Sequence, residues 1–276
     1  MEVLGVGNTA YVDDDFCAKA FPGDHVQVVA AQDTCRDESS PHASWKELLQ
    51  HLEQAYEFDR VVYLSNYLTP HTDTVGDIEL LRSVFRACAG RRVQLLYVAG
   101  PAGAEGAVDA AGRTGKGIIA RAANDLCRYY AAREGVQTKI LRVPFLYTAS
   151  AALEDPFLVP LFDACSTGSV ALQGAQDAAF PLLCAEELAV LVRRIFDSWD
   201  ASFETLDVAD TFHHASGEVG EALKALFPGL SVAYGDSAGY ALPVSDVVRV
   251  RYGWFQRYDL LRDLSTIQAR WDAGRA

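Results

Sequence analysis

Short apolar runs alternate with amphipathic segments along the first half of the chain, and this alternation limits the fold more than any other feature. Five runs read as strands: residues 2–6, 26–30, 61–65, 93–99 and 138–143. The segments between them that carry apolar residues at helical spacing are 14–21, 45–56, 75–88 and 117–133. Continuous apolar strands separated by helices predict a parallel sheet covered on both faces, which is a doubly wound α/β domain.

The spacing loosens after about residue 150, and this change predicts two parts. Residues 1–150 form the sheet domain, of the type that binds nucleotides, and residues 151–276 form a smaller α+β lobe over the carboxyl ends of the strands, from which the chain can return to the main sheet. Helices are expected in the lobe at residues 186–196 and 217–226. Residues 99–117 are rich in Gly and Ala and are either a flexible loop or an ordered lid.

Composition excludes several classes of partner. The chain has 276 residues and a formal net charge of −13, the wrong sign for a general nucleic-acid binder or for a grip on an anionic membrane. No apolar stretch reaches the roughly 20 residues of a spanning helix, and no basic leader is visible, so we expect a cytoplasmic protein without a membrane role. The six cysteines form no CxxC pair and fit no zinc spacing, so we expect them to be reduced and largely buried.

A glycine-rich turn follows the first strand. It reads Gly5-Val6-Gly7-Asn8-Thr9-Ala10, a G-x-G-x-x-A pattern between a strand and a helix. Such a turn lets backbone N–H groups approach a pyrophosphate at a helix N-terminus. The candidate cofactor-binding residues at this end of the sheet are therefore Gly5, Gly7, Asn8, Thr9 and Ala10, joined by Ser65 and Asn66 where the third strand ends.

Two features oppose a nucleotide here. Asp13, Asp14 and Asp15 follow the turn directly. Three carboxylates suit the positive end of a helix dipole, but they repel a phosphate at the same place. The second feature is the ribose-binding carboxylate expected about 20 residues past the glycines. The nearest acid is Asp33, which lies one or two residues late.

The order of motifs resembles the extended short-chain dehydrogenase/reductases, the NAD-dependent epimerase/dehydratase family. The matching segments are residues 3–13 (glycine turn), 73–81 (N-V-x-G-T-x-N-L-L helix), 95–98 (strand before the catalytic serine), 139–144 (L-R-P strand), 182–189 (F-I-H-V-D-D-L-A) and 252–260 (L-G-W-x-P-x-x-S-L). The resemblance implies a Rossmann-like sheet and NAD(P) as cofactor. It also implies a homodimer or heterodimer through the helices at residues 75–88 and 117–133, which would form a four-helix bundle.

The family's catalytic set is missing on this alignment. The resemblance implies a Tyr acid/base, a Lys four residues later and an orienting Ser or Thr. The Tyr position falls on Lys116 and the Lys position on Ala120, and the strand end Ala99-Gly100-Pro101-Ala102 offers no hydroxyl. A phenol of pKa about 10 needs the nearby ammonium to act as a base. The sequence therefore indicates a degenerate member without the family's redox chemistry.

Three functions stay open. One is a non-catalytic binding, scaffold or partner subunit with no cofactor. Another is a divergent NAD(P)-dependent epimerase, dehydratase or reductase acting on a nucleotide sugar or similar small molecule, with Lys116, Tyr67 and Tyr147 as replacement catalytic groups. The third is a sensor that binds NAD(P) or another nucleotide. Arg142 either grips a phosphate or carboxylate or forms a structural ion pair across the lobe interface. A metal shared by His213 and His214 is not expected, because adjacent side chains diverge.

Overall fold

Six parallel strands form one sheet in the order β2-β1-β3-β4-β5-β9. The computed structural model describes residues 1–7, 11–30, 58–65, 75–100, 115–149, 155–172, 174–208, 212, 214–236 and 246–275. The strands of the sheet are β1 Glu2–Gly7, β2 His25–Ala30, β3 Arg60–Leu64, β4 Gln94–Ala99, β5 Gln137–Arg142 and β9 Phe203–Asp207. The doubly wound parallel sheet expected from the sequence is confirmed.

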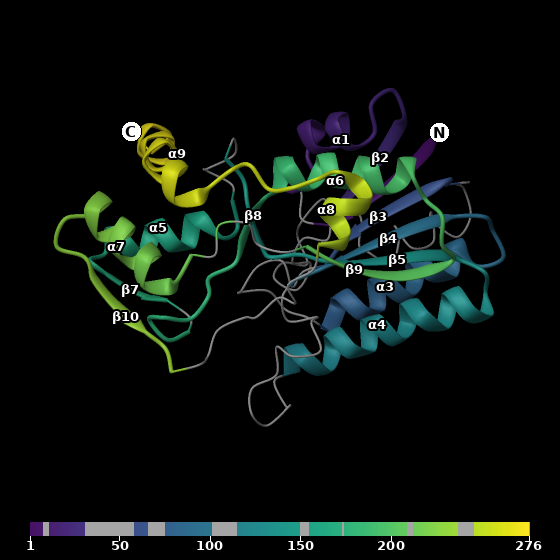
Figure 1. The fold of residues 1–276 in the computed structure, drawn as a ribbon, viewed down its shortest axis with the longest axis horizontal. Coiled ribbons are helices and arrows are strands. Elements are labelled where there is room, and N and C mark those ends of the chain that lie inside the picture. The colour runs from purple at the N-terminus through teal and green to yellow at the C-terminus, as the bar shows by residue number, and fades with distance from the viewer. Residues whose placement is uncertain are drawn as a thin grey trace, which may run out of the picture.

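Helices cover both faces of the sheet (Figure 1). One face carries α1 (Asp14–Ala20), α6 (Ala185–Asp197) and the short α8 (Val247–Tyr252). The other face carries α3 (Val75–Cys88) and α4 (Gly115–Arg133). Consecutive strand residues alternate between the two cores: Val3 packs toward α6, and Leu4 packs toward α3. Because both faces are buried, the strands read as uninterrupted apolar runs.

The second lobe has a core of its own. Its strands pair two by two, β6 (Phe145–Tyr147) with β8 (Leu182–Cys184) and β7 (Ser169–Leu172) with β10 (Ser231–Tyr234). Its helices are α5 (Leu158–Ser166), α7 (Ser216–Leu226) and α9 (Leu260–Ala273). Between β8 and α7 the chain returns to the main sheet, where β9 pairs with β5. Residues 151–276 therefore contribute to both parts.

The predicted elements agree with the observed ones to within about two residues. The predicted helix at residues 75–88 coincides with α3, and the helix predicted from residue 117 begins at Gly115. The predicted helix at 45–56 and most of the segment 99–117 lie outside the described residues. Five cysteines are described, and all are buried free thiols, as expected: Cys17, Cys88, Cys127, Cys165 and Cys184. No described helix combines the length and apolarity needed to cross a membrane.

One buried cation was not foreseen. Lys139 lies in the apolar strand β5 with a fully buried side chain, and its Nζ donates to Asp200 at 3.0 Å and to Glu204 at 2.9 Å. The same Nζ reaches the Tyr252 hydroxyl at 3.1 Å. Buried charges persist where partners satisfy them. This network ties α8, which ends at Tyr252, to the edge of the sheet.

Gly7 allows a direct steric test of how β1 packs. Gly7 has φ 156°, and a Cβ added there would lie 2.9 Å from Leu64 Cβ. Gly23 also has positive φ, 81°, but a Cβ there would meet nothing within 4 Å. We expect Gly23→Ala to cost about 1 kcal/mol through backbone strain, and Gly7→Ala to cost roughly 1–3 kcal/mol more through overpacking. Urea unfolding of both variants measures the difference, and equal losses would show that β1 and β3 have room to spare.

Candidate functional site

The carboxyl ends of β1 and β3 meet where the sequence places the glycine turn. A Cβ added at Gly5 would lie 3.0 Å from Val12 Cγ1, and one added at Gly7 would also be 3.2 Å from Val12 Cγ2. Both glycines therefore make room for contacts inside the protein, with Val12 and, at Gly7, with Leu64. The pattern G-x-G is accounted for by packing of the first turn on its own sheet.

The start of α1 is capped by the chain's own carboxylate. Asp13 is the N-cap residue, and its Oδ1 accepts a hydrogen bond from the backbone N–H of Phe16 at 2.7 Å. Asp14 and Asp15 stand in the first turn, and Asp15 pairs with Lys19. As expected, the three carboxylates lie at the positive end of the helix, where they are favourable. They leave negative charge at the place where a dinucleotide would bring a pyrophosphate.

Tyr11 joins this turn to the second lobe. Its side chain is buried, and its hydroxyl donates to the Leu146 carbonyl in β6 at 2.9 Å. Burial raises the pKa of Tyr11 well above its usual value, and the nearby Asp155 carboxylate raises it further. This phenol holds its proton and acts as a structural donor rather than as a base.

Asp155 organises the beginning of α5. It is fully buried, and its carboxylate accepts from the backbone N–H groups of Thr148 at 2.5 Å, Phe157 at 2.8 Å and Leu158 at 2.6 Å. Burial nevertheless raises the pKa of Asp155 to about 6, against the effect of these hydrogen bonds. No sequence pattern singled out this residue, because an isolated Asp before a helix looks like any cap.

Ser65 closes β3 at the same end of the sheet. It is buried, and its N–H donates to the Val98 carbonyl at 3.0 Å. Its hydroxyl has no hydrogen-bond partner within the described part of the chain. Four other predicted cofactor residues lie outside the described residues: Asn8, Thr9, Ala10 and Asn66. Asp33, the predicted ribose contact, also lies outside them.

Of the three predicted catalytic groups, only Tyr147 has a described side chain. Tyr147 lies in β6 inside the core of the second lobe, and burial strongly raises its pKa. Lys116 stands in the first turn of α4, with its side chain outside the description, and Tyr67 is not described. Ala120, where the family's lysine would stand, is buried in α4.

Arg142 forms the structural ion pair rather than an open anion site. Its Nε donates to Asp207 Oδ1 at 2.5 Å and its Nη2 to Asp207 Oδ2 at 2.8 Å. This two-point pair joins β5 to β9. The sequence predicts this ion pair across the lobe interface, whereas the structure places it within the main sheet. The planar fork that would grip a phosphate is already held by a carboxylate.

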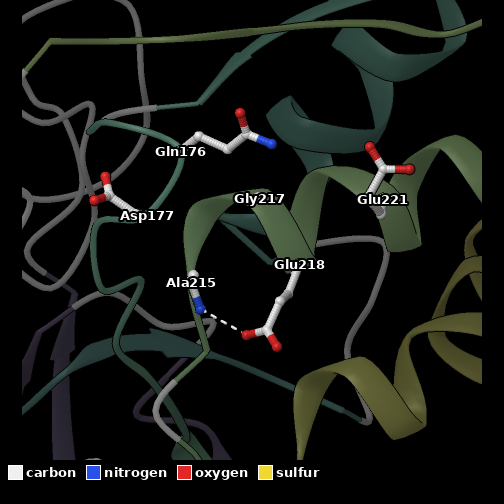
Figure 2. Close-up of a pocket in the computed structure, with 6 residues that line it drawn as sticks. All are labelled: Gln176, Asp177, Ala215, Gly217, Glu218 and Glu221. Carbon is white, nitrogen blue, oxygen red and sulfur yellow. Dashed lines mark hydrogen bonds between the residues drawn. The ribbon is translucent and has the colours of Figure 1, made fainter.

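A wide, open pocket of about 620 Å³ lies in the second lobe beside the start of α7 (Figure 2). Its lining residues are Gln176, Asp177, Ala215, Gly217, Glu218 and Glu221. Glu218 caps the helix by accepting from the Ala215 N–H at 2.8 Å, as Figure 2 shows. Three carboxylates on the lining make the pocket unsuited to an anion. The sequence did not single out these residues.

His214, which lies two residues before α7, connects the start of α7 to the start of α9. Its Nε2 lies 2.7 Å from Asp259 Oδ1, and Asp259 caps α9. The described residues contain no group of His, Cys, Asp and Glu arranged to hold a metal ion.

Comparison with known proteins places the fold. No family model matches the sequence, and no curated protein matches it. Solved structures do match over almost the whole chain. UDP-glucose 4-epimerase from Thermotoga maritima, solved with UDP-glucose, has a TM-score of 0.72 at 12% identity, with 100% of this chain and 99% of that chain covered.

Two further structures agree. The dTDP-glucose 4,6-dehydratase DesIV from Streptomyces venezuelae, with NAD bound, gives a TM-score of 0.71 at 12% identity, covering 99% and 97% of the two chains. A short-chain dehydrogenase/reductase superfamily protein from Agrobacterium tumefaciens, also with bound NAD, gives 0.70 at 13% identity, covering 99% of each. The chain thus has the fold of the extended short-chain dehydrogenase/reductases, and the resemblance inferred from the motifs is confirmed at the level of the fold.

The cap on α1 predicts a measurable stability cost. Asp13→Ala removes the acceptor for the Phe16 N–H and is expected to lower the free energy of unfolding by about 1 kcal/mol. Asp13→Ser keeps a capping oxygen without the charge and should recover most of that loss. Chemical denaturation of the three proteins tests this, and an Ala variant as stable as the parent would contradict the capping role.

Asp155 predicts a pH dependence. Burial raises the pKa of Asp155 to about 6 in the folded state, above the 3.8 of the unfolded chain. Between these two pH values the folded state therefore binds more protons than the unfolded state. The contribution to stability is full below about pH 4 and is lost as pH rises through 6, on the order of 3 kcal/mol. Relative to Asp155→Asn, the parent should lose stability from pH 4 to 7. If the free energy of unfolding of the two proteins changed equally with pH from 4 to 7, the raised pKa of Asp155 would be refuted.

Proposed function

We propose that this protein is a non-catalytic binding or scaffold subunit built on the extended short-chain dehydrogenase/reductase fold. The observation that carries the proposal is the Asp13 carboxylate on the Phe16 N–H at 2.7 Å. A dinucleotide of this fold places its pyrophosphate at the start of the first helix. Here that start already holds an anion, and Asp14 and Asp15 add two more.

The residues at the turn do not fit NAD(P). A phosphate needs free N–H groups and backbone that it can approach closely. Neither requirement is met at the described residues. The Phe16 N–H already donates to Asp13, and Val12 and Leu64 fill the space beside Gly5 and Gly7. The helix itself has seven residues, so its dipole is short. That two of the similar structures hold NAD is a property of those proteins.

The chemistry points the same way. The described end of β4, Ala99 followed by Gly100, carries no hydroxyl. Ala120 puts a buried methyl where the resemblance expects an ammonium. Tyr147, a candidate replacement, has its pKa raised by burial and keeps its proton at neutral pH. These residues support loss of hydride transfer.

A sensor of small polar ligands is the second candidate. One observation favours it, the buried Ser65 hydroxyl, which lacks a partner within the described residues at the sheet end where ligands of open α/β sheets bind. A hydroxyl left unpaired by the protein is suited to a ligand or an ordered water.

The proposal is tested with the purified protein. Mass spectrometry of small molecules released on denaturation should recover no NAD(P). Thermal unfolding with millimolar NAD⁺ or NADP⁺ should show no shift, whereas a ligand at 100 times its Kd would add about 2.7 kcal/mol. The dehydratase DesIV from Streptomyces venezuelae, whose structure holds NAD, is treated identically as the positive control for cofactor release and binding. Recovered NAD(P), or a shift with either nucleotide, would overturn the proposal.

A further inference from the structure

Exposed apolar side chains gather on the surface formed by α6, α8 and the segment that follows α8. Eight large apolar side chains are exposed among the described residues, and five of them belong to this surface. Single exposed apolar side chains are normal, whereas a group of them on one surface marks a contact with another molecule. We call this group the α8 patch: Val190, Val247, Val250, Phe255 and Tyr258.

Hydrogen bonds place the members of the α8 patch side by side. Arg194 on α6 donates to the carbonyl of the last residue of α8 at 2.8 Å, and Glu187 on α6 accepts from the Tyr258 N–H at 3.0 Å. The segment after α8 therefore runs along α6, and Figure 1 shows it crossing that helix. Val190 lies between Glu187 and Arg194 on the same side of α6, beside the middle of the segment, where Phe255 stands.

The Phe255 ring is held outward by its buried neighbours. Trp254 and Gln256 are buried, and Phe255 between them is exposed. Trp254 Nε1 donates to the Glu187 carbonyl at 3.1 Å, and Gln256 Nε2 donates to the Leu182 carbonyl at 2.8 Å. The segment is thus fixed in place before any partner binds, so a contact here costs little conformational entropy.

Charged side chains beside the α8 patch form pairs of opposite sign. On α6, Arg193 Nε lies 3.6 Å from Asp197 Oδ2, and on α8, Arg249 Nη2 lies 3.2 Å from Asp246 Oδ1. These pairs cancel, although the whole chain has a net charge of −13. Two copies of such a chain repel each other through their net charge. A neutral apolar patch is where they can approach most closely.

Two further arginines border the α8 patch. Arg251 pairs with two carboxylates, Asp200 and Glu204, and has no charge to spare. The Arg257 guanidinium lies over the exposed Phe255 ring, 5.2 Å from its centre, and makes no ion pair within the described residues. One such cation does not give the patch a strong sign. The border therefore favours a partner surface that is itself apolar with balanced charges.

We propose that the α8 patch joins two copies of this chain about a two-fold axis. A two-fold contact sets a patch against itself, so the patch must be complementary to itself. The apolar side chains meet this condition, and so do the paired charges, because Arg249 of one copy can face Asp246 of the other. A strongly acidic or strongly basic partner finds no such match.

This surface differs from the one that the family resemblance implies. α6 and α8 cover one face of the sheet, and the implied dimer helices α3 and α4 cover the other. The inference goes beyond the proposed function and does not depend on whether NAD(P) binds.

Sedimentation equilibrium of the full-length protein measures the association. The parent should form a dimer that about 0.5 M NaCl does not weaken, because the centre of the contact is apolar. Val250 is 78% exposed in the single chain, so Val250→Asp should leave the fold intact. The dimer would bury two new carboxylates, and its dissociation constant should rise at least about ten-fold. Phe255→Ser should act in the same direction through loss of the exposed ring.

Matched controls make the same changes on other surfaces. Val28→Asp alters an exposed valine on β2, and Tyr129→Ser removes an exposed ring from α4. Both should leave the dissociation constant within about two-fold of the parent value. Circular dichroism confirms that each variant is folded.

Three results would overturn the inference. They are a parent that sediments as a monomer at every concentration, a dimer that Val250→Asp and Phe255→Ser leave intact, and a dimer that Tyr129→Ser weakens as much as Val250→Asp does. Recovery of NAD(P) from the protein would overturn the proposed function and leave this contact untouched, so the two failures are distinguishable.

Discussion

The proposed use of this fold rests on one hydrogen bond, from the Phe16 N–H to the Asp13 carboxylate. In a doubly wound sheet, the start of the first helix is the strongest anion site that the backbone offers. When a residue of the chain supplies the anion, the helix gains a cap, and we propose that the site is thereby closed to phosphate. The adjacent Asp14 and Asp15 extend the same exclusion outward through charge.

Packing around the first turn completes this closure. Val12 and Leu64 occupy the space that Gly5 and Gly7 leave open, and Tyr11 reaches across to the Leu146 carbonyl of the second lobe. The turn is thus fastened on one side to its own sheet and on the other to β6. These contacts show that the first turn helps to hold two parts of the protein together.

Periodicity predicted the elements well because each strand is buried on both faces and each helix has one buried side. The helix α3, with Val84 and Phe85 buried and Arg82 and Arg86 exposed, was recognisable for this reason. Pairing between distant residues could not be read in the same way. Arg142 meets Asp207 and Lys139 meets Glu204 only because β5 and β9 lie next to each other, although 65 residues separate each pair. The glycine pattern was easy to find in the sequence, but its cause was ambiguous. Close packing and phosphate binding both favour glycine, because it has no side chain.

The most direct test of the central claim follows the Phe16 amide itself by ¹H–¹⁵N NMR. Asp13→Ala, which removes the acceptor, should move its resonance, and Asp13→Ser, which keeps a capping oxygen, should move it less. Millimolar NAD⁺ or inorganic pyrophosphate at neutral pH should leave the Phe16 resonance where it is. A saturable shift of that amide by either compound would show that a phosphate displaces the carboxylate, and would contradict a turn closed to nucleotides.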